Sequence, residues 1–296
     1  MKDAFARCHP WLNLVFYLWV MGITIFCMHP VLLGLSGVAA CGYLLRLRGW
    51  KGLGRGCALA LPVMVLSAVI NPLFSHQGMT VLGYLPSGNP VTLESLLYGL
   101  CTGGMMGVMV LWCITWAQVM TSDKIIYLCG KGFPALSLLI SMVLRFLPHF
   151  TAQTQRVMEA QRCVGRDMRQ GSVWQRLHQG GRVLSILVTW SLETSVDTAD
   201  SMKARGYGLP GRTQYHRYRW DLRSTLWLAG MMGCGIAVLA GVATKELDMR
   251  YAPLWRMNEA TVVACVCYGL YGVLCAVPLI LNGVEDWKWR YWMCKI

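Results

Sequence analysis

The chain carries little charge for its length. Only 14% of its 296 residues are charged, whereas soluble domains carry about 25%. The remaining sequence forms long apolar runs, and 55% of all residues are hydrophobic, which excludes an ordinary soluble domain. We therefore predict an all-α integral membrane protein with about six transmembrane helices. The predicted membrane helices are approximately 11–28, 31–45, 57–70, 93–120, 222–243 and 260–281.

The sequence also lacks the usual catalytic motifs. It contains no G-x-S-x-G and no H-E-x-x-H, and Cys129-Gly130-Lys131 lacks the upstream glycine of an ATP-binding P-loop. The six histidines are scattered. Most cysteines lie in apolar runs, where a free thiol behaves as a small hydrophobic side chain, and their spacing does not fit a zinc site. We expect no catalytic residue, no metal and no cofactor.

The predicted membrane helices contain almost no ionisable residue, and Glu94 lies at a helix end. Ion-coupled carriers usually place such residues at mid-membrane, so this chain is not expected to carry an ionic substrate alone. Gly99, Gly103 and Gly107 follow a four-residue spacing that lets helix backbones approach closely. We expect these glycines to pack helices within the chain; a sliding contact with another membrane subunit is the alternative.

The distribution of basic residues predicts the orientation in the membrane. The net charge is +13, and cytoplasmic segments of membrane proteins carry the excess of lysine and arginine. Segments 1–10, 46–55, 121–221 and 282–296 hold most of the basic residues, whereas 71–93 has none. We predict a multi-pass protein of the cell membrane with both termini in the cytoplasm. Because this rule already explains the basic excess, no nucleic-acid partner is expected.

Charge also divides the chain into three predicted parts. Residues 1–120 hold the first four membrane helices, 121–221 form a cytoplasmic coupling domain, and 222–296 hold the last two membrane helices and a cytoplasmic tail. The central part carries 14 of the 27 lysines and arginines. Its apolar blocks are only 10 to 14 residues long, short of the roughly 20 needed to span a bilayer.

Two long amphipathic cytoplasmic helices are predicted within residues 134–206. The break between them is expected at Gln170-Gly171-Ser172, since glycine ends helices and serine starts them. Pro148 is expected to kink the first helix. In the alternative, Pro134–Leu147 would span the membrane, but the basic residues that follow it would then lie outside the cell.

Each predicted cytoplasmic helix ends in a basic segment closed by glycine. The second ends Ala204-Arg205-Gly206, where arginine favours the helix C-terminus and glycine can terminate it. The first ends Cys163-Val164-Gly165, between Arg162 and Arg166. One such end would be an ordinary helix terminus. Two of them could present guanidinium groups to grooves on a partner protein.

At these residues the chain resembles the T component of energy-coupling factor (ECF) transporters, the group of the CbiQ-type and BioN-type membrane subunits. The resemblance covers about residues 90–225. It implies a bacterial or archaeal membrane scaffold with two partners in addition to the lipid bilayer. Two cytosolic ABC-type ATPase subunits supply energy, and a small membrane S protein binds the substrate. The matching segments are Thr121-Ser122, Phe133-Pro134, Arg145-Phe146-Leu147-Pro148, Glu159-Ala160-Gln161, Ala199 to Gly206, Gly208 to Thr213, and Tyr218.

The family's coupling helices each end in Ala-Arg-Gly and dock in grooves of the ATPases. Here the resemblance implies that Ala204, Arg205 and Gly206 form an intact second docking motif. The first motif keeps Gly165 but has Val164 in place of arginine, so either Arg162 or Arg166 takes that role or the contact is weaker. The sixth membrane helix is a further departure, since the family often has five.

Two other functions are compatible with the sequence. Glu159-Ala160-Gln161-x-x-x-Gly165 also resembles the cytoplasmic loop of conventional ABC importer permeases, which present one short coupling helix rather than two long ones. An integral membrane enzyme acting on lipid phosphates is the other alternative, although no His/Asp constellation supports it. The resemblance leaves the substrate open among vitamins, nickel and cobalt.

Overall fold

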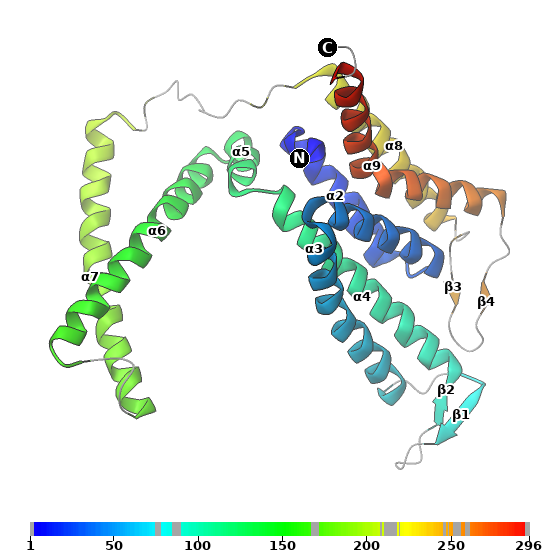
Figure 1. The fold of residues 1–296 in the computed structure, drawn as a ribbon, viewed down its shortest axis with the longest axis horizontal. Helices are drawn as coiled ribbons and strands as arrows, with labels where there is room; N and C mark the ends of the chain where they lie inside the picture. Colours follow the sequence, from blue (N-terminus) through cyan, green and yellow to red (C-terminus); the bar gives the residue numbers. More distant parts are fainter. Residues whose placement is uncertain are drawn as a thin grey trace. The chain divides into compact units, whose positions relative to one another are not determined.

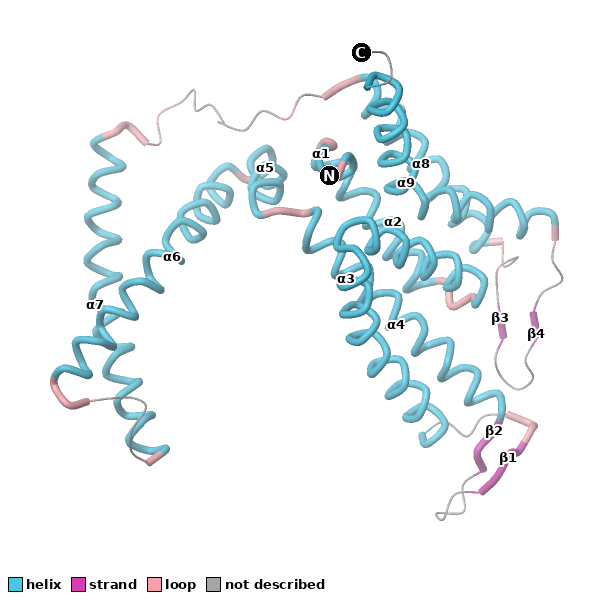
Figure 2. The backbone as a smooth tube through the Cα atoms, viewed as in Figure 1, coloured by secondary structure: helices cyan, strands magenta, loops and turns pink. Residues whose placement is uncertain are grey.

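A computed structural model describes residues 3–74, 78–84, 90–166, 172–207, 220–244 and 261–293, together with 209, 218, 247, 249–250 and 256–257. The described chain is almost entirely helical, with two short β-hairpins (Figures 1 and 2). It forms two compact units. One unit, which we call the membrane unit, comprises Met1–Ile125 and Tyr218–Ile296. The other, Ile126–Arg217, contains the two helices expected to act in coupling, and we call it the coupling unit. The boundary falls inside α5 (Ser122–Gly132).

Long apolar helices make up the membrane unit, and all six predicted membrane stretches fall on helices. The bounds of α4 and α8 are close to those predicted. By length and composition alone, α3, α4, α6, α8 and α9 could each cross a membrane, and α2, with 17 residues, is slightly short. The protein is thus an all-α integral membrane protein. The helices of this unit are α1 (Ala4–Arg7), α2 (Pro10–Phe26), α3 (Pro30–Phe74), α4 (Leu93–Val119), α8 (Leu222–Ala243) and α9 (Val262–Met293).

The predicted loop 46–55 is wrong. Helical residues continue from α3 on both sides of this region, and only Gly49 leaves helical geometry, with φ 67° and ψ −170°. Glycine tolerates a positive φ because it has no Cβ. A Cβ on Gly56 would lie 2.6 Å from Leu44 Cδ2, although these residues would be about 18 Å apart along a straight helix. The helix therefore folds back at Gly49 into two arms.

Glycines let α4 pack closely against the second arm of α3. Gly99, Gly103 and Gly107 are buried. A Cβ on Gly103 would lie 2.6 Å from the carbonyl oxygen of Met64, and one on Gly99 would lie 3.1 Å from that of Ala68. The backbones approach so closely that no side chain fits between them at Gly103. These three glycines thus form part of an intrachain contact.

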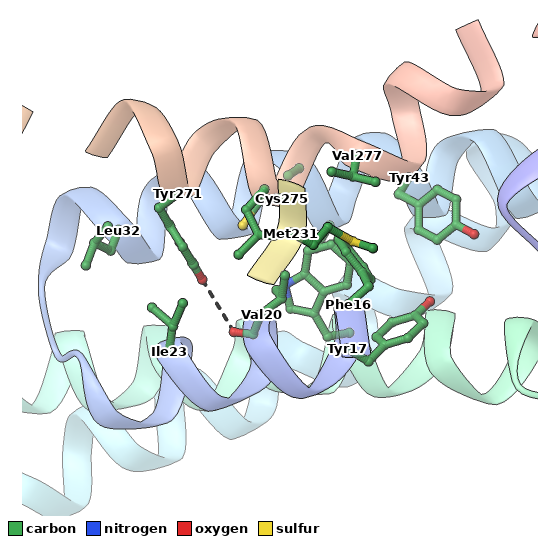
Figure 3. Packing of buried hydrophobic residues seen from close by; sticks show 14 of the residues in the cluster. Phe16, Tyr17, Val20, Ile23, Leu32, Tyr43, Met231, Tyr271, Cys275 and Val277 are labelled. Atoms are coloured by element: carbon green, nitrogen blue, oxygen red, sulfur yellow. Dashed lines mark hydrogen bonds between the residues drawn. The ribbon is translucent and has the colours of Figure 1, made fainter. Parts of the chain in front are cut away.

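Aromatic side chains fill the core of the membrane unit (Figure 3). Phe16 and Tyr17 of α2 meet the ring of Trp112 of α4 edge-on. Trp112 Nε1 donates a hydrogen bond to Ser36 Oγ of α3 at 2.9 Å. Tyr271 of α9 points toward α2 in Figure 3, where its hydroxyl lies 3.5 Å from the Val20 carbonyl oxygen. The core therefore ties four helices together through both packing and hydrogen bonds.

Polar side chains hold the N-terminal segment against this unit. The Asp3 carboxylate accepts hydrogen bonds from Tyr43 Oη at 2.6 Å and from Asn282 Nδ2. Lys124, at the start of α5, donates to the carbonyl oxygen of Ala6. Burial lowers the pKa of Lys124 to about 8. We call Asp3, Tyr43, Lys124 and Asn282 the N-terminal clasp. Ion pairs Arg7–Glu285 and Arg46–Asp286 lie beside it.

Two connections and the tail also differ from prediction. The predicted loop 71–93 contains a hairpin of β1 (Val81–Tyr84) and β2 (Pro90–Thr92), paired antiparallel. A second small hairpin pairs β3 (Met249–Arg250) with β4 (Arg256–Met257). Helix α9 runs on to Met293, beyond the predicted end at 281. Asn282 and Glu285, in the first turn of α9 beyond residue 281, contact the N-terminal segment through Ala4 and Arg7.

Two long helices cross in the coupling unit, α6 (Pro134–Cys163) and α7 (Val173–Ala204). The Trp190 ring stacks on Phe146 at 5.7 Å between centroids and lies 5.4 Å from the ring of His149. Ser172 caps α7 in a reciprocal capping box with Gln175, so the predicted helix start is confirmed; Gln170 and Gly171 lie outside the described residues. Helix α6 continues through Pro148 to Cys163, and the predicted kink stays a prediction.

Candidate docking surface

The end of α6 is a regular glycine terminus. Val164 is the C-cap, and Gly165 follows it with φ 76°. The Gly165 amide donates to the carbonyl oxygen of Arg162 and the Arg166 amide to that of Gln161, both at 2.9 Å. This pair of bonds is the Schellman motif, in which the glycine's positive φ turns the chain back over the last turn.

The end of α7 has the same backbone structure. Arg205 is the C-cap, and Gly206 follows with φ 74°. The Gly206 amide donates to the Lys203 carbonyl oxygen at 3.0 Å and the Tyr207 amide to that of Met202 at 3.1 Å. The two ends therefore have the same hydrogen-bond pattern and the same backbone turn.

This equivalence fixes which side chains correspond. Val164 occupies the C-cap position that Arg205 holds at the other end. Arg162 corresponds to Lys203, and Arg166 corresponds to Tyr207. Neither arginine of the first end takes the C-cap position, so the two ends present different side chains from one shared backbone frame.

All of the proposed docking side chains are accessible. Arg162 and Arg166 are exposed at the first end, and Ala204 and Arg205 are exposed at the second. Val164 is 67% exposed, which leaves an apolar side chain at the tip of the helix. The side chains at both helix ends are therefore accessible to a protein partner.

The two ends lie at separate tips of the crossed pair (Figure 1). His149 and Trp190 meet at the crossing. Each lies 14 residues before the last helical residue of its own helix, Cys163 or Ala204. At the α-helical rise, each arm is about 21 Å long. The two ends thus lie at similar distances from the crossing.

Charge distinguishes the ends further. Residues 152–166 contain Arg156, Arg162 and Arg166 against one acidic residue, a net charge of +2. The matching stretch 193–207 contains three acidic and two basic residues, a net charge of −1. Lys203 lies 3.8 Å from Asp200 in an exposed pair, and such a pair contributes little stability.

Both long helices of the coupling unit leave apolar side chains exposed. Four exposed residues on α6 and four on α7 recur every three or four positions, so each group follows one side of its helix. Helix α7 buries only Val183 and Leu187. The unit therefore offers apolar surface to lipid or protein. The exposed residues are Leu136, Leu139, Val143 and Leu147 on α6 and Leu184, Val188, Leu192 and Val196 on α7.

Two contacts were not predicted from the sequence, one at the crossing in the coupling unit and one in the N-terminal clasp of the membrane unit. Trp190 was not identified as the crossing residue, although a large aromatic in a charged helix is a signal for a helix contact. Lys124 was not identified as buried, because nothing in its neighbouring sequence distinguishes it from a solvated lysine. Within the described part of the chain, no group of three or more His, Cys, Asp or Glu residues could hold a metal ion.

Residues 7–216 match the family described as cobalt transport protein, CbiQ. The chain is 36% identical over 106 residues to the energy-coupling factor transporter transmembrane protein EcfT of Bacillus selenitireducens, covering 36% of this chain and 40% of the relative. It is 37% identical over 95 residues to EcfT of Lactobacillus helveticus, covering 32% and 34%. EcfT 1 of Listeria monocytogenes is 28% identical over 173 residues, covering 53% and 63%. The chain therefore matches less than two thirds of the length of these curated relatives.

Proposed function

This chain belongs to the CbiQ family of cobalt transport proteins, and we propose from that membership that it is the transmembrane coupling subunit of an ECF-type ABC importer. The names of its relatives support the assignment to a transporter's transmembrane component. The observation that carries the coupling role is the pair of crossed helices with matching, exposed C-terminal turns. A scaffold that receives force at two points needs such paired ends.

The proposed partners are two ABC-type ATPases and a small membrane S protein that binds the substrate. Arg205 is the main docking residue, held at the tip of α7 by the Gly206 turn. Its guanidinium can form two parallel hydrogen bonds to a carboxylate in an ATPase groove. The chain itself is proposed to be non-catalytic, with ATP hydrolysed by the partners.

Transmission through the crossed helices is the proposed mechanism. When ATP brings the ATPases together, their grooves carry the ends of α6 and α7 with them. Because the two arms extend from a crossing around Trp190, movement of the ends would change the angle at which the helices cross. The apolar side of α6, including Leu136–Leu147, then moves and tilts the S protein within the bilayer.

Charge reversal at Arg205 tests the docking role. We expect Arg205→Glu to insert normally into the membrane but to lose the ATPases on purification in mild detergent and to lose uptake. Removing one partner of a buried charge pair weakens binding by about 2–5 kcal/mol. Charge reversal also introduces repulsion between the glutamate and the carboxylate of the groove. Arg182→Glu is the matched control, because it makes the same charge change at an exposed position nearer the middle of α7. Normal uptake by Arg205→Glu would refute the docking assignment.

Membrane topology is a separate part of the proposal. We propose that both termini and the coupling unit lie in the cytoplasm, which the distribution of lysine and arginine supports. Helix α6 is nevertheless long and apolar enough to span. A topology reporter inserted after Arg166 distinguishes these arrangements: cytoplasmic signal is expected, and extracellular signal would mean that α6 crosses the bilayer.

Association with the S protein separates this function from that of a conventional permease. An ECF scaffold should co-purify with ATPases and a small membrane protein that binds the substrate. A conventional permease would retain ATPases without an S protein. Activity of the isolated chain on lipid phosphates would instead favour the enzyme alternative.

A further inference from the structure

We propose that the two docking ends bind their partner grooves by different chemistry. Arg205 enters an acidic groove, whereas Val164 rests on an apolar floor whose acidic rim contacts Arg166 and Arg162. The proposal rests on the proposed function, because the occupant of each end is an ATPase subunit. Each helix end therefore fits a groove of different composition, and Val164 determines which groove binds the end of α6.

The common backbone of the two ends is the first argument. Both ends are Schellman turns with the same two hydrogen bonds and a glycine at φ 76° or 74°. A difference in docking therefore cannot come from a missing turn or from a displaced helix end. It has to come from the side chains, and the C-cap position carries valine in α6 and arginine in α7.

The chemistry of those two side chains is the second argument. A groove that binds Arg205 must offer carboxylate or carbonyl oxygens to the guanidinium. If Val164 were buried in such a groove, those oxygens would lose their water without gaining a partner, which is unfavourable. Conversely, Val164 gains from burial on an apolar floor, because two thirds of its surface is now exposed to solvent.

Charge complementarity is the third argument. The α6 end carries a net charge of +2 and the matching stretch of α7 carries −1. An acidic rim complements the first end through Arg166, which follows Gly165 directly, and Arg162. The acidic residues Asp197 and Asp200 lead up to the second end, so a groove that accepts Arg205 is expected to carry basic residues beside its acidic site. Complementary charge of this kind determines which surfaces associate.

The two helix ends therefore cannot exchange grooves. A groove suited to one end places an unpaired charge or an uncovered apolar side chain against the other. The ATPase pair should therefore present two grooves of different composition, and each end of the scaffold should occupy only one of them.

Exchange variants test the proposal in the assembled complex. We measure how much of the ATPase pair stays with the scaffold in mild detergent, and uptake in cells, for Val164→Arg and the matched control Val164→Ile. Val164→Arg places a charge on the apolar floor, and we expect about a tenfold loss of retained ATPase. Val164→Ile keeps an apolar side chain, and we expect retention within about twofold of wild type.

Unchanged or increased ATPase retention in Val164→Arg would overturn the proposal, because it would mean that the first groove accepts arginine as the second does. Equal losses in Val164→Arg and Val164→Ile would also overturn it, since the groove would then be selecting size rather than polarity. Membrane insertion and thermal stability of each variant are measured as controls. Both should be unaltered, because residue 164 lies at an exposed helix end.

Charge reversal at Arg166 provides an independent measurement. We expect Arg166→Glu to reduce ATPase retention and to weaken its dependence on salt, because a charged contact with the acidic rim has been removed. Unaltered retention and salt dependence would contradict the acidic rim. Failure of the proposed function has a different signature: the wild-type scaffold itself would retain no ATPase, or Arg205→Glu would retain as much as wild type.

Discussion

The membrane unit and the coupling unit differ in how completely each buries its own side chains. In the membrane unit, Tyr17, Tyr43, Trp112 and Tyr271 are fully buried, and side chains from several helices form one core. In the coupling unit, α7 buries only Val183 and Leu187. The first unit contains its own core, whereas the described helices of the second leave many apolar side chains exposed.

Helix geometry explains this difference. Helices that pack along their length, as α4 does on the second arm of α3, bury a row of side chains at each turn. Helices that cross at one point touch only near that point, here around Trp190. Crossed helices gain less stability from each other, but their ends remain accessible and can be moved. The difference is consistent with the proposed function, in which a packed membrane unit carries two coupling helices.

The largest effect is expected from breaking the crossing itself. Trp190→Ala removes the ring that contacts Phe146, His149 and Phe150. We expect the coupling unit to lose about 2–3 kcal/mol of stability. Because Trp190 is only half-buried, this is no more than the smallest cost found when a buried aromatic residue is replaced by alanine. Uptake should fall strongly, while the membrane unit stays folded.

Trp174→Ala is the control for that variant, because Trp174 lies on the same helix but is 80% exposed. Limited proteolysis of the coupling unit, together with uptake, measures the effect. If the two tryptophan variants show the same proteolysis and the same uptake, the crossing does not transmit movement. The difference in packing between the membrane unit and the coupling unit would then have no functional role.

An intermediate effect is expected at the closest helix contact of the membrane unit. Gly103→Ala places a methyl group 2.6 Å from the Met64 carbonyl oxygen, and the backbone there cannot rotate away as a side chain could. We expect a loss of about 1–3 kcal/mol, as for other overpacked cores. The measurement is thermal unfolding in detergent.

The neighbouring Gly104→Ala variant is the matched control, because a Cβ at that position meets nothing within 4 Å. It should be neutral or stabilising by up to about 1 kcal/mol, since alanine favours helix more than glycine does. Similar melting temperatures for the Gly103 and Gly104 variants would show that α3 and α4 are not packed as tightly as proposed for a rigid scaffold.

The smallest effect is expected from the pH dependence of the N-terminal clasp. Lys124 is 5% exposed, and burial lowers its pKa from 10.5 to about 8. In the unfolded chain it keeps its proton up to about pH 10.5, so burial of the charged form costs stability below about pH 8. That cost declines as pH rises from about 8 toward 10.5. Between about pH 7 and pH 9, the free energy of unfolding therefore rises by about 1 kcal/mol.

We expect wild type to gain stability relative to Lys124→Met as the pH is raised through this range. Thermal unfolding of both proteins at matched pH values measures the difference. Burial raises the pKa of the adjacent Cys8 thiol, which delays its own ionisation. A constant difference between wild type and variant would show that Lys124 is solvated rather than held in the clasp.

Local sequence signals predicted the long helices and most of their ends, apart from the loop at 46–55 and the end of α9. Ser172 starts α7 through a capping box with Gln175, and both residues of this signal lie within four positions of each other. Gly165 and Gly206 end their helices by adopting a positive φ that glycine accepts readily. These features were predictable because the groups involved are neighbours in the chain.

Long-range contacts were not predictable in the same way. Four positive charges around Gly49 indicated a loop, yet the chain folds back there with only one residue outside helical geometry. Asp3 and Asn282 lie at opposite ends of the sequence and meet in the clasp. Nothing in either local sequence specifies the other, so neither contact could be derived without the folded arrangement.

The sequence by itself determined the membrane class, most helix ends and the two glycine-terminated helix ends proposed for docking, because apolar length, capping and positive φ are local properties. Only the tertiary structure decided that α3 folds back at Gly49, that Trp190 forms the crossing, and that Val164 and Arg205 occupy equivalent positions. These features depend on which surfaces meet, and packing of distant segments determines that. Because the two helix ends share one backbone turn, their difference lies in the side chains, valine at one C-cap and arginine at the other.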